Sequence, residues 1–343
     1  MHSLVSVGAK QSIPPHPIRR DRKSRDMEVF RDIEDIEDFR RPELKTVVTM
    51  GNFDGIHLGH QALVGNAVAE AKQWHSKSIV FTFEPHPMKL LAPERAPQMI
   101  LNHQDKMEML QALGVDAIIV QTFDRRFASI EAEDFVRRYL LERLNLSKIW
   151  LGRDLRFGRA RQGDAEDLIR WGSELGFSVG IVEPILVQGK RISSSRIRQL
   201  IEQGRVNEVQ PMLGRYHFIS GTIVSGHRRG RNMGFPTANL DATTELLPQD
   251  GIYASILELQ NRRWLSVSSV GHNPTFGEGS RTIEAYILDF AQDIYGESVK
   301  LSFVHRIREE RRFAQIADLV TQMHEDVHAA RAIFDQLNLG YKN

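Results

Sequence analysis

One stretch near the start of the chain decides the fold: Thr46-Val47-Val48-Thr49-Met50-Gly51-Asn52-Phe53-Asp54-Gly55-Ile56-His57-Leu58-Gly59-His60. Its first four residues are apolar or β-branched, and they predict a short buried strand. The glycines that follow let the backbone turn tightly and approach a ligand closely. Helical spacing of apolar residues begins next, so the free N–H groups of a helix start point into the same space. This order predicts a phosphate site at the carboxyl edge of a parallel sheet.

The same alternation of strand and helix continues to about residue 213. Apolar β-branched runs predict four more strands, at 78–83, 116–120, 148–151 and 177–182. Segments with 3.6-residue periodicity predict helices at 60–74, 104–113, 132–144 and 164–175, followed by two shorter ones at 194–202 and 207–213. Strands and helices that alternate in this way indicate a Rossmann-like α/β domain, with a parallel sheet between two layers of helices.

The pattern changes at Gly214. Short alternating runs separated by turn residues predict an antiparallel barrel or sandwich, and they lie at 216–224, 251–259, 263–270, 282–290 and 299–307. One amphipathic helix, at about 314–336, ends the chain. We therefore expect a basic tail over 1–26, an α/β domain over 27–213 and an all-β domain with a C-terminal helix over 214–343.

Composition narrows the class of protein. A length of 343 residues suits two domains. The chain has 45 Lys and Arg against 44 Asp and Glu, and a net charge of +1 gives no overall attraction to nucleic acid or membranes. The absence of cysteine excludes disulfides, thiolate metal sites and cysteine nucleophiles. No apolar run reaches the roughly 18 residues of a membrane span, so we expect a cytoplasmic protein.

Residues 1–25 differ from the rest of the chain. They hold three prolines and six basic side chains against the single acidic residue Asp21, which is typical of a disordered tail. One alternative is an electrostatic arm for RNA or a membrane. Another is an upstream start codon, with Met27 as the true first residue.

His57 and His60 are the first candidate site residues. They are spaced i and i+3, so both can face one point at the helix start, where a triphosphate would lie. The alternative is an ordinary turn with two surface histidines. A metal site is less favoured, because the sequence has no His-Glu-x-x-His string and no evident third ligand.

Two later strings in the first half belong to the same edge of the sheet. Ser193-Ser194-Ser195-Arg196-Ile197-Arg198 opens a helix with hydroxyl groups, and Arg198 adds a cation that can hold a phosphate. Gly152-Arg153-Asp154-Leu155-Arg156-Phe157-Gly158 follows a strand, where loops of such sheets bind ligands. Either string alone could be simple helix capping or turn chemistry. The string Phe83-Glu84-Pro85-His86-Pro87 also follows a strand and predicts another ligand-facing loop.

The second half has one informative string and one carboxylate. The string is Gly226-His227-Arg228-Arg229-Gly230-Arg231-Asn232-Met233-Gly234-Phe235-Pro236-Thr237-Ala238-Asn239-Leu240, and it predicts a rigid loop with exposed amides. The Thr237 hydroxyl and the Asn239 carbonyl are hard oxygen ligands that suit Mg²⁺ beside nucleotide phosphates. Glu284 lies mid-strand among apolar residues, where it either faces solvent or acts as a general base.

The first half resembles the nucleotidylyltransferase superfamily, in which a His-x-Gly-His motif binds the phosphates of ATP. The resemblance implies that His57 and His60 are catalytic and stabilise charge on the phosphates. It implies an ATP site made of Gly51, Asn52, Phe53, Asp54, His57, His60, Ser194, Ser195 and Arg198. The loop after the strand at 148–151 would bind flavin through Asp154 and Phe157.

The second half resembles riboflavin kinase, a six-stranded barrel that phosphorylates the 5′-hydroxyl of the vitamin. The resemblance implies that Thr237 and Asn239 hold Mg²⁺ and that Glu284 is the catalytic base. The ATP and flavin contacts would be Gly230, Arg231, Gly234, Phe235, Pro236, Thr237, Asn239 and Arg308.

Both halves, in this order, resemble the bacterial bifunctional riboflavin kinase/FMN adenylyltransferases, also called FAD synthetases. That family implies riboflavin, FMN and ATP as substrates, FAD as product, Mg²⁺ as cofactor, no nucleic acid or membrane partner, and a possible homo-oligomer. Departures from the family pattern are small: Ser195 replaces a usual Thr, Asp154 stands where Asp or Asn occurs, and Asn232-Met233 precedes Gly234.

Two other functions fit parts of the sequence. The first is a single-activity nucleotidylyltransferase whose barrel merely binds flavin. The full set of Thr237, Asn239 and Glu284 argues against it, because a binding module needs neither metal ligands nor a base. The second is a flavin-sensing or RNA-binding regulator that uses the basic tail, which the near-zero net charge does not favour.

Overall fold

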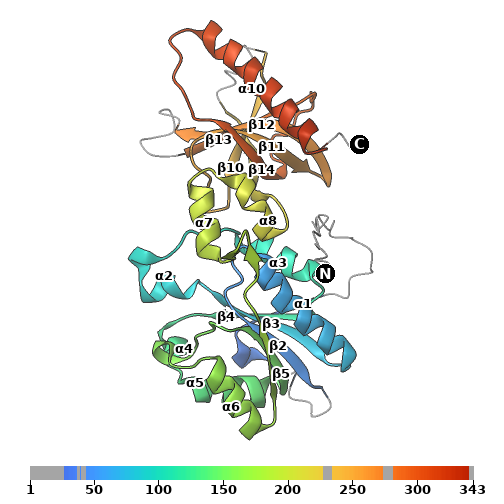
Figure 1. The fold of residues 1–343 in the computed structure, drawn as a ribbon, viewed down its shortest axis with the longest axis vertical. Coiled ribbons are helices and arrows are strands. Elements are labelled where there is room, and N and C mark those ends of the chain that lie inside the picture. The colour runs from blue at the N-terminus through green and yellow to red at the C-terminus, as the bar shows by residue number, and fades with distance from the viewer. Residues whose placement is uncertain (1–26, 37–38, 40–43, 227–233, 273–280, 340–343) are drawn as a thin grey trace, which may run out of the picture.

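The computed structural model describes residues 27–36, 39, 44–226, 234–272 and 281–339. The N-terminal part holds a parallel sheet, the C-terminal part holds a closed barrel, and short helices lie between them (Figure 1). This confirms the predicted combination of an α/β domain with an all-β barrel. The predicted tail at 1–26 lies outside the described residues.

The N-terminal sheet has six parallel strands in the order β1-β4-β3-β2-β5-β6. The five predicted strands are β2 (Thr46–Met50), β3 (Lys77–Glu84), β4 (Ala117–Thr122), β5 (Leu146–Gly152) and β6 (Ser178–Val182). The sixth, β1 (Glu28–Arg31), was not predicted, and it pairs with β4 at the edge. The chain reverses its direction of travel across the sheet between β2 and β5, so their carboxyl ends form the switch point where such sheets bind ligands.

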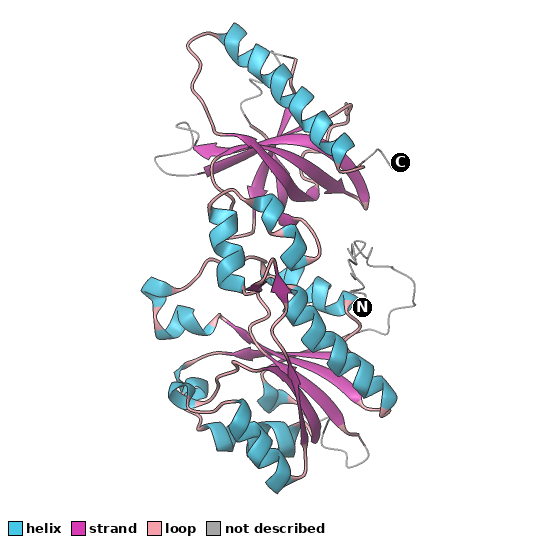
Figure 2. Ribbon diagram, viewed as in Figure 1, coloured by secondary structure: helices cyan, strands magenta, loops and turns pink. Residues whose placement is uncertain are grey.

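Helices cover both faces of this sheet (Figure 2). Alternate strand residues enter opposite layers: Phe81 packs beneath the helices that follow β4 and β5, whereas Val80 packs beneath α1 and α3. The helices of the N-terminal part, not all of which lie on the sheet, are α1 (Leu58–Gln73), α2 (Pro87–Leu91), α3 (His103–Ala112), α4 (Arg125–Ala128), α5 (Ala132–Asp134) and α6 (Ala165–Leu175). The helix predicted over 132–144 is a short α5 that continues as a π-helix, Phe135–Arg143.

A small connecting unit follows the sheet. It contains the hairpin of β7 (Leu186–Val187) and β8 (Lys190–Arg191), then α7 (Ser194–Glu202), a 3₁₀ turn (Val206–Glu208) and α8 (Gln210–Leu213). The bounds predicted for α7 are confirmed. The second predicted helix, over 207–213, is instead the 3₁₀ turn and α8.

The C-terminal part is a closed antiparallel barrel in the order β10-β13-β12-β11-β14-β9. Its strands are β9 (His217–Val224), β10 (Thr237–Ala242), β11 (Gly251–Leu259), β12 (Arg262–His272), β13 (Arg281–Ile287) and β14 (Ser298–Arg308). Five of them match the predicted runs. The prediction of a rigid loop over the Thr237 string was wrong from Thr237 onward, because β10 begins at that residue.

The last helix, α10 (Ile316–Gln336), lies across the outside of the barrel (Figure 1). Its buried side chains Ala330 and Phe334 pack against Ala254 and Val304 of the barrel wall. Among the described helices, none combines the length and the apolar character that crossing a membrane requires.

The two parts share an interface. Phe218 of β9 packs in the same apolar cluster as Phe53 and Val64 of the N-terminal part. Lys300 of β14 forms ion pairs with Asp105 and Glu108 of α3, at 3.0 and 2.7 Å. The contact is therefore partly apolar and partly ionic.

Candidate active sites

The start of α1 places the two predicted histidines side by side, with His57 at the N-cap and His60 in the first turn. Their rings stack with centroids 3.6 Å apart. His57 is the N-cap of α1, and its Nδ1 accepts a hydrogen bond from the backbone N–H of His60, at 3.3 Å. Because Nδ1 of His57 accepts, the proton of the neutral ring lies on Nε2. The predicted meeting of these side chains at the helix start is thus present in the structure.

Both imidazoles are electrically neutral. Burial lowers the pKa of His57 to about 4, and burial together with the adjacent His57 lowers the pKa of His60 well below its ordinary value. The Nδ1 atom of His60 is buried and has no hydrogen-bond partner among the described residues. These rings can therefore offer a phosphate N–H donors, but not positive charge.

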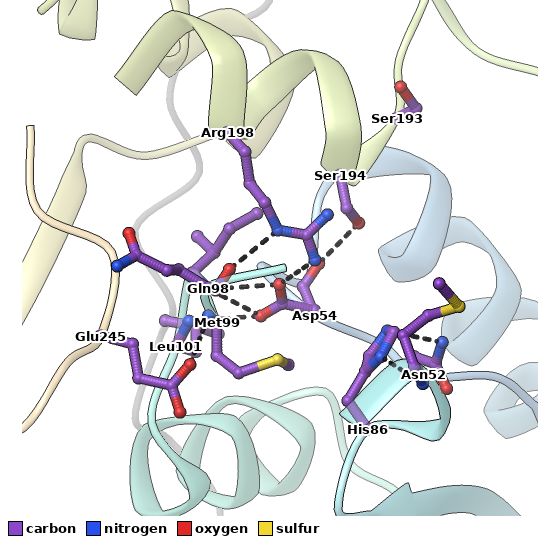
Figure 3. A network of polar contacts seen from close by, with 12 residues as sticks. Asn52, Asp54, His86, Gln98, Met99, Leu101, Ser193, Ser194, Arg198 and Glu245 are labelled. Carbon is purple, nitrogen blue, oxygen red and sulfur yellow. Dashed lines mark hydrogen bonds and ion pairs between the residues drawn. The ribbon is translucent and has the colours of Figure 1, made fainter. Parts of the chain in front are cut away.

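Asp54 forms the centre of a network of hydrogen bonds in the same loop (Figure 3). Its carboxylate accepts hydrogen bonds from the backbone N–H groups of Ile100 and Leu101, and it pairs with Nη2 of Arg198 at 2.6 Å. The Ser194 hydroxyl donates to the Asp54 carbonyl at 3.0 Å. Three of the predicted ATP-site residues thus come together, although Asp54 is only 2% exposed and orients Arg198.

Other predicted ATP-site residues have different surroundings. Phe53 is buried and packs edge-on against the His60 ring. The backbone N–H of Gly51 donates to the Phe81 carbonyl. Ser195 is exposed in the first turn of α7. The side chain of Asn52 meets His86, as described below.

Asp154 and Phe157, the predicted flavin contacts, lie on the loop after β5, at the switch point of the sheet. Asp154 forms an ion pair with Arg191 of the β7–β8 hairpin. Phe157 is buried, exchanges two backbone hydrogen bonds with Gly163, and packs against Phe135 and Trp171. The aromatic ring therefore supports the loop from inside the core.

Two groups beside the loop between β2 and α1, the half-buried His86 and the buried Lys106, had little signal in the sequence. His86 caps α2, and its Nε2 lies 3.0 Å from the Asn52 amide nitrogen. Only the position of its string after a strand indicated a role. Lys106 of α3 is buried, and its Nζ donates to the Thr82 hydroxyl at 3.2 Å. The sequence did not indicate a role for Lys106, because a lysine within an amphipathic helix pattern is expected on the solvent-facing side.

The second centre lies on the outer face of β10 and β13. Asn239 stands opposite Glu284 in the strand register, and the Thr237 hydroxyl donates to Oε2 of Glu284 at 3.0 Å. The neighbouring Ala238 and Ala285 point into the barrel core, so the three polar side chains face outward together. The structure thus brings together the predicted metal ligands and the predicted base.

The other residues predicted for this centre have different surroundings. Phe235 is buried against Tyr286 of β13 and His324 of α10, between the exposed Gly234 and Pro236. Arg308 forms two 2.7 Å contacts with the buried carboxylate of Asp326 in α10, so it anchors that helix. Gly230 and Arg231 lie outside the described residues.

The donor set of the second centre fits a magnesium ion. The Thr237 hydroxyl and the Asn239 carbonyl are neutral hard oxygens, and nucleotide phosphates can supply the rest of the oxygen shell. Among the described residues, no group of three or more His, Asp or Glu side chains is placed to hold a metal ion.

Comparison with protein-family models gives two matches. Residues 40–196 match the model described as FAD synthetase, and residues 213–334 match the model described as riboflavin kinase. The two matches fall on the sheet part and the barrel part, respectively.

Comparison with individual proteins agrees. A bifunctional riboflavin kinase/FMN adenylyltransferase of Escherichia coli is 35% identical over 85% of this chain and 94% of its own length. Those of Listeria monocytogenes and Buchnera aphidicola are 34% and 31% identical, and cover 86% and 90% of this chain. A solved structure from Streptococcus pneumoniae, described as a macrolide-efflux protein, has a TM-score of 0.80 at 33% identity, covering 89% of this chain and 99% of that one.

Proposed function

The chain belongs to the family of bifunctional riboflavin kinase/FMN adenylyltransferases, and from this membership we infer that it makes FMN and then FAD. The barrel phosphorylates riboflavin with ATP. The sheet part then joins FMN to the AMP portion of a second ATP. The adjacent matches to both family models are the observation that supports two activities in one chain.

In the adenylyltransferase centre, an oxygen of the FMN phosphate attacks the α-phosphorus of ATP. The bond from that phosphorus to the bridging oxygen breaks, and pyrophosphate leaves. We assign His57 and His60 as neutral N–H donors to the phosphates, which is supported by their lowered pKa values. Arg198 supplies positive charge while Asp54 orients it, and Ser194 holds the loop.

The loop after β5 is our proposed flavin contact of this centre. Its place at the switch point supports this, since ligands of such sheets bind there. Asp154 would contact FMN directly, with Arg191 fixing its carboxylate. Phe157 would position the loop from the core.

In the kinase centre, the 5′-hydroxyl of riboflavin attacks the γ-phosphorus of ATP, and ADP leaves. Glu284 accepts the hydroxyl proton, a role supported by its outward position beside Thr237 and Asn239. Those two residues would hold Mg²⁺, which supplies charge neutralisation for the phosphates. Phe235 and Arg308 stabilise this region through their contacts with α10.

We propose that residues 27–213 form the adenylyltransferase domain and residues 214–343 the kinase domain. The change from a parallel sheet to an antiparallel barrel between α8 and β9 supports this boundary. We also propose that the protein works in the cytoplasm, where ATP is available.

Product analysis tests the function directly. The full-length protein is incubated with riboflavin, ATP and Mg²⁺, and the flavins are separated by chromatography. We expect FMN to appear first and FAD to follow. Formation of FMN alone would overturn the adenylyltransferase activity, and formation of neither product would overturn both.

Two variants test the assignment of two separate centres. Glu284→Gln removes the base, so FMN formation should fall at least about a hundredfold while FAD formation from added FMN is unchanged. His57→Ala combined with His60→Ala should have the reverse effect. Loss of both activities in either variant, when it is well folded, would contradict the assignment.

A further inference from the structure

Lys106 is a buried charged residue beside the segment that joins β2 to the first turn of α1, residues 51–60, which we call the phosphate loop. It lies on α3, and only 4% of its surface is exposed to solvent. Lysine is almost never fully buried unless it is paired. A lysine in this position therefore needs an explanation.

The contacts of Lys106 lead into the loop between β2 and α1. Its Nζ donates to the Thr82 hydroxyl, and that hydroxyl donates to the backbone carbonyl of Asn52, at 3.3 Å. An ammonium group has three N–H donors, and Thr82 takes only one of them. The ammonium thus lies under the phosphate loop with hydrogen-bonding capacity to spare.

The carboxylates around Lys106 have other partners. Asp54 pairs with Arg198, and Asp105 pairs with Lys300. Oε2 of Glu84 lies 3.4 Å from Nδ1 of His103. Among the described residues, no ion pair joins a carboxylate to Lys106. Burial lowers the pKa of Lys106, and the fields of Glu84 and Asp54 offset that effect only in part.

We propose that Lys106 is a positioning residue for ATP in the adenylyltransferase centre, acting as the counter-charge beneath the phosphate loop. The ATP phosphates bring several negative charges to residues 51–60, where both histidines are neutral. A buried cation acts on them through a medium of low polarity, in which charges interact more strongly than in water. The inference deepens the proposed function and rests on it.

A purely structural lysine would behave differently. A lysine that held α3 in place would stabilise the protein without ligand, and its removal would lower the melting temperature. A buried cation without a counter-ion costs free energy until the phosphates arrive. Removing it should leave the melting temperature of the ligand-free protein equal or higher, and weaken only the use of ATP.

The test compares Lys106→Met, Lys106→Arg and wild type as full-length proteins. FAD formation is started from FMN and ATP, so the kinase centre is bypassed. We expect Lys106→Met to lower kcat/KM for ATP by about tenfold to a hundredfold, with the KM for FMN unchanged. Lys106→Arg keeps the charge and should retain most of the wild-type kcat/KM.

Two controls make the result specific. FMN formation from riboflavin, measured on the same variants, should not change, because Lys106 belongs to the other centre. Lys72→Met removes an exposed lysine from the last turn of α1 and should leave FAD formation unchanged.

The proposal is overturned if Lys106→Met retains wild-type kcat/KM for ATP. It is also overturned if both activities fall together with the melting temperature, because that outcome identifies a structural lysine. Failure of the wild-type protein to form FAD is a separate result, which removes the proposed function itself.

Discussion

Each histidine of the phosphate loop owes its neutrality to burial rather than to hydrogen-bonding partners. His57 keeps one ring nitrogen for its own helix and leaves the other for a ligand. A charged pair at 3.6 Å would repel, and the fields of Arg191, Arg198 and Arg215 would add to that repulsion. Positive charge near these rings therefore comes from Arg191, Arg198, Arg215 and Lys106, and not from the histidines.

The neutral state of His57 predicts acid destabilisation. Its pKa is about 4 in the folded protein and 6.5 when unfolded, so the unfolded chain binds more protons between these pH values. The free energy of unfolding should be fully retained above pH 6.5 and fall by roughly 2–3 kcal/mol by pH 4.5. Urea denaturation at pH 7.5 and 4.5 measures this.

The control for that prediction is His57→Asn. Asparagine can still cap α1, but it does not titrate. The variant should lose less stability than wild type on acidification. Equal losses in the two proteins would contradict the assignment of the effect to His57.

Gly226 predicts a second effect of a single residue. A Cβ atom at this position would lie 2.1 Å from the Asn239 amide nitrogen, so Gly226→Ala must displace that side chain. We expect FMN formation to fall about tenfold, since displacing the proposed metal ligand costs an interaction of about 1–2 kcal/mol. FAD formation from added FMN should be unchanged. Steady-state kinetics at several Mg²⁺ concentrations measure both effects.

The control for Gly226 is Gly65→Ala. Gly65 lies in α1, and an added Cβ there meets no atom within 4 Å. This variant should keep both activities. Unchanged FMN formation in Gly226→Ala would show that Asn239 tolerates displacement.

At the residue scale, the sequence strings predicted which side chains gather but not their partners. Three of them, Thr237, Asn239 and Glu284, meet as the resemblance to riboflavin kinase implied, although the strand that carries Thr237 and Asn239 was not predicted. The pairing of Asp54 with Arg198 joins residues 144 positions apart, and no local pattern encodes it. The Arg308–Asp326 pair was not predicted either, because no local sequence pattern encodes it.

Among the elements, long periodic segments were predicted well and short ones were not. Strand β11 matches its predicted bounds, and α7 does too. Strand β1 was missed because four residues beside a charged tail carry too little periodicity. Strand β10 was predicted as a loop because Pro236 and Asn239 are typical of turns, and tertiary pairing with β9 and β13 overrides that tendency.

A buried ion pair joins the C-terminal helix to the barrel, in addition to the apolar packing of Ala330 and Phe334. The Arg308 and Asp326 side chains are 13% and 5% exposed, respectively. Asp326→Ala leaves the arginine buried without its partner, which should cost about 3–5 kcal/mol. Urea denaturation measures the loss, and FMN formation should fall because α10 also packs on Phe235 through His324.

Two further variants check this interpretation. Asp335→Asn removes an exposed carboxylate of α10 and should be nearly neutral. Arg308→Met with Asp326→Leu removes both charges and should recover much of the stability. Failure of the double variant to recover would mean that the pair does more than anchor the helix.

For the whole molecule, the barrel supports the adenylyltransferase centre across the interface. Arg215 lies two residues before β9, is half-buried, and donates to the Gly55 carbonyl of the phosphate loop at 2.9 Å. Lys300 of β14 neutralises the buried Asp105, one residue before Lys106. The two parts are therefore physically coupled beyond their covalent connection.

The Lys300 ion pairs predict a long-range effect. Lys300→Met should lower the free energy of unfolding by about 1–3 kcal/mol, less than for a fully buried pair because the Lys300 side chain is 33% exposed. It should also slow FAD formation from FMN, although Lys300 lies in the kinase barrel. Denaturation and steady-state kinetics measure the two effects.

The double variant Lys300→Met with Asp105→Asn serves as the control. It removes the unpaired buried carboxylate and should recover part of the lost stability. Unchanged FAD formation in Lys300→Met would contradict support of that centre by the barrel.

The short segment after β10, which contains Glu245 and Leu246, limits where related sequences can gain or lose residues. Both backbone hydrogen-bonding groups of Met99 are used by this segment: its N–H donates to the Glu245 side chain, and its carbonyl accepts from the N–H of Leu246. The next N–H along the chain, that of Ile100, holds Asp54. An insertion or deletion between Asn239 and Leu246 would displace either Asn239, the proposed metal ligand of the kinase centre, or the contacts of Met99 that support the other centre. The number of residues between Asn239 and Leu246 is therefore constrained by both centres at once. We expect related sequences to differ in length at other positions and not in this segment.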